Sequence, residues 1–155
     1  MSISDIEDKI LIYDLQSRYS RLIDSADYAG LDSIFTVDVH AEYGELLEGL
    51  ESVKDFISDV LEPLTSVQHQ NGNHWAEIEG DAAKGGCYFT VHQYQEGLEN
   101  GEFYKMGGYY LDELVRTEQG WRISKRQVKV RWAEGNPEVR WDGRSTEMSE
   151  SSLLN

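Results

Sequence analysis

Apolar residues recur every three or four positions early in the chain and every second position in its later half. The early spacing predicts one amphipathic helix with a single buried stripe. The apolar members of that stripe are Ile6, Ile10, Leu11, Leu15, Tyr19, Leu22 and Ile23. Ser4 and Glu7 form a capping-box pattern, so we expect the helix to begin at Ser4. Asp24 follows the stripe directly and opposes the helix dipole, so helix stability does not explain it.

Two further helices are predicted before the strands begin. Residues 27–35 form a short helix capped by Asp27, and a third helix starts at Ser52 and stops near Pro63. The inner face of this third helix consists of Val53, Phe56, Ile57, Val60 and Leu61. A short strand over residues 39–43 lies between these two helices and ends at Tyr43.

The later half of the chain predicts a meander of strands joined by tight turns. The strands cover residues 73–79, 85–94, 103–115 and 121–132. Asn100-Gly101 is the strongest hairpin signal in the chain. Gly85-Gly86 and Gly107-Gly108 fall where a bent sheet needs bulges or kinks. Three helices followed by a strand meander predict an α+β fold, with the helices packed on one face of a curved antiparallel sheet.

Charge and composition narrow the possible partners. Lys and Arg number 14 against 29 Asp and Glu, which gives the 155-residue chain a net charge of −15. Such a charge argues against nucleic-acid binding and against anionic membrane surfaces. The single cysteine, Cys87, excludes an internal disulfide. Because the first residues show no signal-peptide pattern, we expect a cytoplasmic protein of one domain, residues 1–141, with a polar tail over 142–155.

The sequence carries no motif for a common cofactor. His40, His69, His74 and His92 lack zinc-type spacing, so we expect no metal. The paired glycines do not match a phosphate-binding loop, and no nucleophile elbow is present. We therefore expect cofactor-independent chemistry.

A set of residues spread over Ile6 to Trp132 resembles the SnoaL-like branch of the nuclear transport factor 2-like superfamily. The residues that carry the resemblance are Arg18-Tyr19, Asp24, Asp27, Leu31, Phe35-Thr36, Asp38, His69, Asn73, Gly80-Asp81, Gly108-Tyr109-Tyr110 and Gly120-Trp121-Arg122-Ile123. The resemblance implies a cone-shaped sheet wrapped by helices around an apolar pocket. Within the superfamily, the chain looks most like scytalone dehydratase, bile acid 7α-dehydratase and hexachlorocyclohexane dehydrochlorinase.

The resemblance also implies roles for individual residues. Asp24 and His69 match an Asp–His pair that removes a proton during β-elimination. Tyr19 matches a catalytic tyrosine, and Arg131 matches an arginine near the end of the last strand. Tyr43 matches a tyrosine that assists through water, and Asn73 is a candidate substrate contact. Gly108 lies near the place of a second catalytic histidine of scytalone dehydratase, so this chain lacks that group.

Each candidate also has an ordinary structural interpretation. His69 could be a polar loop histidine after the third helix, and Asp24 a solvated acid at a helix end. Tyr19 could be a core tyrosine, Arg131 a surface cation and Asn73 a turn cap. The functional interpretation depends on a carboxylate that fixes the histidine tautomer and leaves its second nitrogen free to take a proton.

Together these observations predict a lyase of the dehydratase type that acts on an apolar ring-containing carbonyl compound. A ketosteroid-type isomerase or polyketide cyclase is one alternative, because it needs the same proton abstraction. A non-catalytic small-molecule-binding module of the same fold is the other. The resemblance further implies a homo-oligomer, with a trimer favoured over a dimer.

Overall fold

The computed structural model describes residues 3–139 of the chain. The predicted tail over 142–155 and Trp141 lie outside the described residues. The elements follow the order α1 (Ile3–Asp24), η1 (Ala29–Ser33), β1 (Phe35–Glu42), β2 (Leu46–Glu48), α2 (Leu50–Leu61), β3 (Ser66–Glu79), β4 (Ala82–Tyr94), β5 (Phe103–Thr117), β6 (Gly120–Gly135) and η2 (Pro137–Val139).

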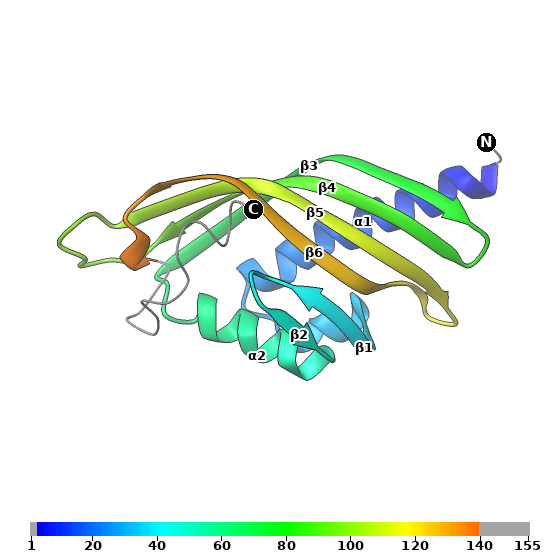
Figure 1. Ribbon diagram of the computed structural model, residues 1–155, viewed down its shortest axis with the longest axis horizontal. Helices are drawn as coiled ribbons and strands as arrows, with labels where there is room; N and C mark the ends of the chain where they lie inside the picture. The colour runs from blue at the N-terminus through cyan, green and yellow to red at the C-terminus, as the bar shows by residue number, and fades with distance from the viewer. Residues whose placement is uncertain (1–2, 140–155) are drawn as a thin grey trace.

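The strands form a six-stranded curved sheet in the order β2-β1-β6-β5-β4-β3. Neighbours pair antiparallel except β1 and β6, which run parallel. Figure 1 shows the four long strands β3–β6 arching over α2 and the β1–β2 pair, with α1 running along the sheet. The predicted α+β fold is confirmed, although the expected helix over 27–35 is a single 3-10 turn. Asp27 still caps that turn, because its Oδ1 accepts from the Gly30 amide at 3.0 Å.

The first half of α1 corrects the predicted stripe. The helix already includes Ile3, so Ser4 lies inside its first turn, and Ile6, Ile10 and Leu11 of the predicted stripe are exposed. The buried face instead carries Asp8 and Ile12. The Asp8 carboxylate accepts two hydrogen bonds from Arg116 at 2.8 Å and one from the Trp121 indole at 3.0 Å. These hydrogen bonds hold the pKa of Asp8 below its usual value, with the Arg116 bonds as the main cause.

The start of β3 also differs from the expectation. This strand begins at Ser66, so His69 lies on a strand and not in a loop. The segment before Asn73 is polar and lacks apolar alternation, so only its pairing with β4 makes it a strand. The strand β2 was not predicted either, because three residues are too few for a periodic signal.

The glycine pairs act in different ways. The β5–β6 register shifts between Gly107 and Gly108, which confirms one predicted bulge. Gly85-Gly86 keeps a regular register with β5, whereas the register between β3 and β4 shifts beside Gly86, between the pairs Gly72–Tyr88 and Trp75–Gly86. A Cβ on Gly86 would lie 2.5 Å from the Tyr110 carbonyl oxygen, so this glycine allows a close backbone approach instead.

Candidate functional site

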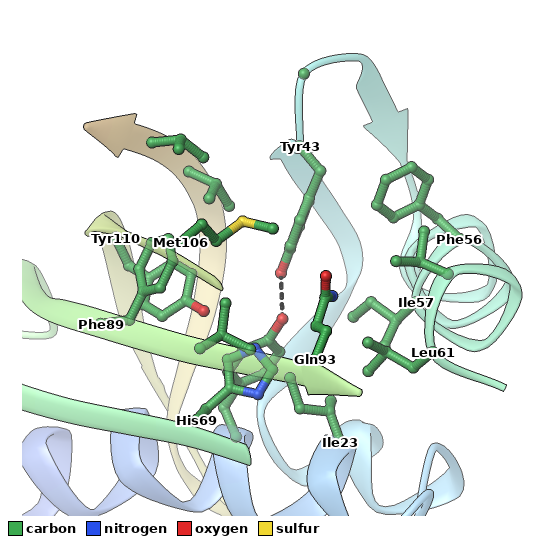
Figure 2. A pocket seen from close by; sticks show the side chains of 16 residues that line it. Ile23, Tyr43, Phe56, Ile57, Leu61, His69, Phe89, Gln93, Met106 and Tyr110 are labelled. Carbon is green, nitrogen blue, oxygen red and sulfur yellow. Dashed lines mark hydrogen bonds between the residues drawn. The ribbon is translucent and has the colours of Figure 1, made fainter. Parts of the chain in front are cut away.

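A pocket lies between the inner face of the sheet, the start of the β1–β2 turn and α2. Its volume is about 100 Å³, and one side is open to solvent. Most of the wall is apolar, and the polar side chains that reach it are His69, Gln93 and three tyrosines (Figure 2). The pocket is lined by Tyr19, Ile23, Tyr43, Gly44, Phe56, Ile57, Val60, Leu61, His69, Phe89, Val91, Gln93, Met106, Tyr110, Val128 and Val130. A mostly apolar cavity with a few convergent polar groups is typical of a small-molecule site.

Asp24 and His69 are hydrogen-bonded to each other on the pocket wall. Asp24 ends α1 and His69 lies four residues into β3, so two distant segments supply the pair. The Asp24 Oδ1 lies 2.6 Å from the His69 Nδ1, and Oδ2 accepts from the His69 backbone amide at 2.8 Å. The His69 side chain is only 9% exposed, which keeps the pair largely out of bulk water.

The contact with Asp24 determines which ring nitrogen of His69 carries the proton. A carboxylate at Nδ1 favours the tautomer in which Nδ1 carries the proton, so Nε2 keeps a free lone pair. No described residue forms a hydrogen bond with the His69 Nε2. Because His69 lines the pocket, this nitrogen can accept a proton from a bound molecule.

His69 also borders a second recess, on the α1 side. That recess is lined by Ser17, Ser20, Arg21, Asp24, His69 and Asn71. The imidazole therefore separates an apolar pocket from a polar recess that contains its carboxylate partner.

Tyr19 and Tyr43 place two hydroxyl groups at the pocket. Tyr19 comes from α1 and Tyr43 follows the end of β1, and their hydroxyl oxygens lie 2.9 Å apart (Figure 2). Burial raises the pKa of both phenols, and for Tyr19 the neighbouring Tyr43 raises it further. Both groups are therefore protonated at neutral pH, and the pair can donate a hydrogen bond to an oxygen that gains negative charge.

A buried ion pair lies beneath these tyrosines. Arg126 on β6 donates to Asp112 on β5 through Nε at 2.7 Å and Nη2 at 2.9 Å, and both side chains are fully buried. The guanidinium carbon lies over the Tyr19 ring and over the Tyr110 ring, at 4.4 and 4.3 Å from their centroids. Burial opposes the charge, but Asp112 outweighs burial and raises the pKa of Arg126, so the cation persists.

Sequence reasoning missed Asp112, Arg126 and Gln93. Asp112 and Gln93 continue the inward alternation of their strands, so period-two spacing could have found them. Arg126 had no such signal, because the β5–β6 register shifts between Glu113 and Leu114 and changes which β6 residues point inward.

Arg131 and Asn73 lie on the other face of the sheet. Both line a groove with Tyr88, Tyr109 and Trp132, and neither lines the pocket that contains His69. Val130 faces the pocket, and the exposed Arg131 follows it at the bulge opposite Gly107 and Gly108. Asn73 has a positive φ of 51° at the irregular point of β3, which suits a turn-like backbone role.

The described residues contain neither a cluster of potential metal ligands nor a helix suited to cross a membrane. Within residues 3–139, no three His, Cys, Asp or Glu side chains gather as potential metal ligands. In the same range, neither helix combines the length and apolar character that a membrane crossing requires.

Comparisons with known proteins identify the family and the fold to which this architecture corresponds. The SnoaL-like domain matches residues 4–127. A Mycobacterium tuberculosis protein, itself named as uncharacterized, is 30% identical over 130 residues, which cover 81% of this chain and 87% of the relative. Solved proteins of the nuclear transport factor 2-like superfamily share the fold.

Two similar solved structures have names that refer to elimination enzymes. A candidate scytalone dehydratase from Novosphingobium aromaticivorans has a TM-score of 0.80 at 15% identity, covering 88% of this chain and 92% of that one. A hexachlorocyclohexane dehydrochlorinase, LinA type 2, has a TM-score of 0.75 at 20% identity, covering 85% of this chain and 90% of that one. At these identities the likeness shows a shared fold.

Proposed function

The chain belongs to the SnoaL-like family, and on that premise we propose that it is a cofactor-independent lyase of the dehydratase type. The substrate is an apolar, ring-containing carbonyl compound with a hydroxyl group β to the carbonyl. One observation carries the proposal: the Asp24–His69 hydrogen bond lies on the wall of an apolar pocket that also holds the Tyr19–Tyr43 hydroxyl pair.

In the proposed reaction, His69 acts as the general base. Its Nε2 takes the proton on the carbon α to the carbonyl, and the electron pair of that C–H bond moves toward the carbonyl oxygen. Asp24 stabilises the imidazolium that forms and keeps the ring oriented. The Tyr19–Tyr43 pair donates a hydrogen bond to the oxygen that gains charge.

The second half of the reaction forms the double bond. The carbon–oxygen bond at the β position breaks as the α–β double bond forms, and the departing hydroxyl takes a proton and leaves as water. His69 gives up its proton in this step, so the enzyme returns to its starting state. The mostly apolar lining of the pocket strengthens each of these interactions, because it excludes water that would screen them.

The elimination itself is a proposal that draws support from two sources. The names of two similar structures refer to a dehydratase and a dehydrochlorinase, both of which are eliminations. Because the identity of these structures to this chain is low, their likeness shows the fold alone. The proposed reaction class therefore rests on the contacts between Asp24 and His69. Product mass distinguishes the alternatives, because dehydration removes one water whereas isomerisation leaves the mass unchanged.

The test is a His69→Ala variant assayed against a panel of cyclic β-hydroxy carbonyl compounds. We expect turnover to fall at least about 100-fold, the usual contribution of a general base. His92→Ala is the matched control, because His92 lies exposed on β4 and does not line the pocket. A His69→Ala rate within about tenfold of the parent rate would remove His69 from the chemistry.

The assembly and location of the protein stay predictions. We propose a homo-oligomer, with a trimer expected ahead of a dimer, and a cytoplasmic location. Analytical ultracentrifugation of the full chain measures the first, and fractionation of source cells measures the second. A monomer, or recovery outside the cytoplasm, contradicts the respective prediction without affecting the proposed chemistry.

A further inference from the structure

Gln93 places a polar group inside the apolar part of the pocket without a partner. It lies on the inner face of β4, two positions after Val91, and is 3% exposed. Its Oε1 is buried and forms no hydrogen bond with any described residue. Figure 2 shows the amide pointing into the pocket, between the hydroxyl end of Tyr43 and the α2 side chains Ile57 and Leu61.

An unpaired amide in this position is costly for the fold. A buried polar group that lacks its hydrogen bond loses the water it bound in the unfolded chain and gains nothing in return. The inner-face positions that precede it on β4, Phe89 and Val91, carry apolar side chains. A residue that works against stability inside a cavity is a candidate ligand contact, because a bound group can supply the missing hydrogen bond.

The hydrogen-bonding chemistry of the Gln93 carboxamide limits which chemical groups of a ligand can pair with it. Its oxygen accepts hydrogen bonds and its nitrogen donates them. A hydroxyl group both donates and accepts, so it pairs with the amide in either orientation of the side chain. A bare carbonyl pairs only with the nitrogen, and an apolar substituent pairs with neither.

The volume of the pocket limits the size of the ligand that it can hold. The pocket volume is about 100 Å³. An apolar protein cavity of about 150 Å³ holds one benzene molecule. The pocket therefore has room for about one six-membered ring, and because it is open to solvent on one side, a larger ligand extends out of its mouth.

We propose that Gln93 is a specificity-determining residue that selects a single-ring ligand bearing a hydroxyl group at the inner end of the pocket. This inference rests on the proposed function only in taking the pocket as the small-molecule site. It adds a recognition group that is separate from His69 and from the Tyr19–Tyr43 pair.

The experiment compares two probes that differ by one hydroxyl group, p-cresol and toluene. Each is titrated into the full-length protein and into a Gln93→Met variant, with binding followed by heteronuclear NMR. The parent protein is expected to bind p-cresol more tightly than toluene. In Gln93→Met the preference is expected to shrink about two- to tenfold, the worth of one neutral hydrogen bond. Gln95→Met is the matched control, because Gln95 also has a buried, unpaired Oε1 but does not line the pocket.

Thermal unfolding of the unliganded proteins separates a ligand contact from a structural role. Because Met removes an unpaired polar group from an apolar wall, Gln93→Met is expected to raise Tm. A lowered Tm, an unchanged preference for p-cresol, or no binding of either probe to the parent protein would each overturn the proposal. Neither probe can undergo the proposed elimination, so a protein with an inert His69 still reports on Gln93, and the two proposals fail separately.

Discussion

The Asp24 carboxylate holds His69 at two points, its ring Nδ1 at 2.6 Å and its backbone amide at 2.8 Å. One carboxylate thus orients the imidazole and also ties the strand that carries it to the end of α1. This double contact accounts for an acidic residue at a helix end where the dipole disfavours it. Both oxygens accept from N–H groups, so an amide at position 24 cannot replace the carboxylate.

An Asp24→Asn variant tests this relationship. We expect kcat to fall at least about 100-fold, because the amide cannot stabilise an imidazolium and can accept only one of the two hydrogen bonds. The ¹⁵N shifts of the His69 ring should report a changed tautomer balance. Asp38→Asn is the control, because Asp38 is exposed on β1. A kcat within about threefold of the parent, with unchanged ring shifts, contradicts the role of Asp24.

The Tyr19–Tyr43 pair makes a second prediction. Tyr43→Phe removes one of two hydroxyls that lie 2.9 Å apart, and the loss of such a donor typically costs 100-fold or more in kcat. Stability should change by only about 1 kcal/mol, since one neutral hydrogen bond is lost. Steady-state kinetics and urea unfolding measure the two effects. Tyr88→Phe, on the exposed outer face of the sheet, should change neither.

Helix α1 shows most clearly which features of the fold can be predicted from the sequence alone and which cannot. Spacing identified this helix correctly but placed Ile10 and Leu11 inside, where the structure buries Asp8 and Ile12. A charged residue is normally assigned to the surface. Only the fold brings Arg116 and Trp121, more than 100 positions along the chain, to the Asp8 carboxylate. Residue type cannot reveal a partner that distant.

The arginines of β6 show a second limit. The resemblance directed attention to Arg131, yet the structure places it on the outer face and buries Arg126 beneath the pocket. A period-two pattern survives only while the register is regular, and β5–β6 contains two shifts. The pairing of Asp24 with His69, in contrast, is what the resemblance implied, although the strand that carries His69 begins earlier than the sequence pattern predicted.

The buried Arg126–Asp112 pair predicts strong coupling. Arg126→Met leaves the Asp112 carboxylate fully buried without its cation, which should cost about 3–5 kcal/mol of unfolding free energy. The double variant Arg126→Met, Asp112→Leu should recover much of that loss, because it removes both charges. Urea unfolding of the two single variants and the double variant measures the coupling. Additive losses would show that the two side chains act independently.

His74 makes a prediction about the pH dependence of stability. Its ring stacks on Tyr13, with Nδ1 2.8 Å from the Gln16 Oε1 and Nε2 3.3 Å from the Ser17 Oγ. Burial lowers the pKa of His74 below its usual value of 6.5.

The sign of the effect follows from proton linkage. As the pH falls below about 6.5, the unfolded chain binds a proton at position 74 at a higher pH than the folded chain does, so the unfolding free energy decreases. In His74→Gln this part of the acid-side decrease should disappear, and urea unfolding at about pH 7.5 and about pH 5.5 measures it. His92→Gln, at an exposed position on β4, should keep the parent slope. An unchanged slope in His74→Gln would mean that His74 takes up its proton equally in the folded and unfolded chains.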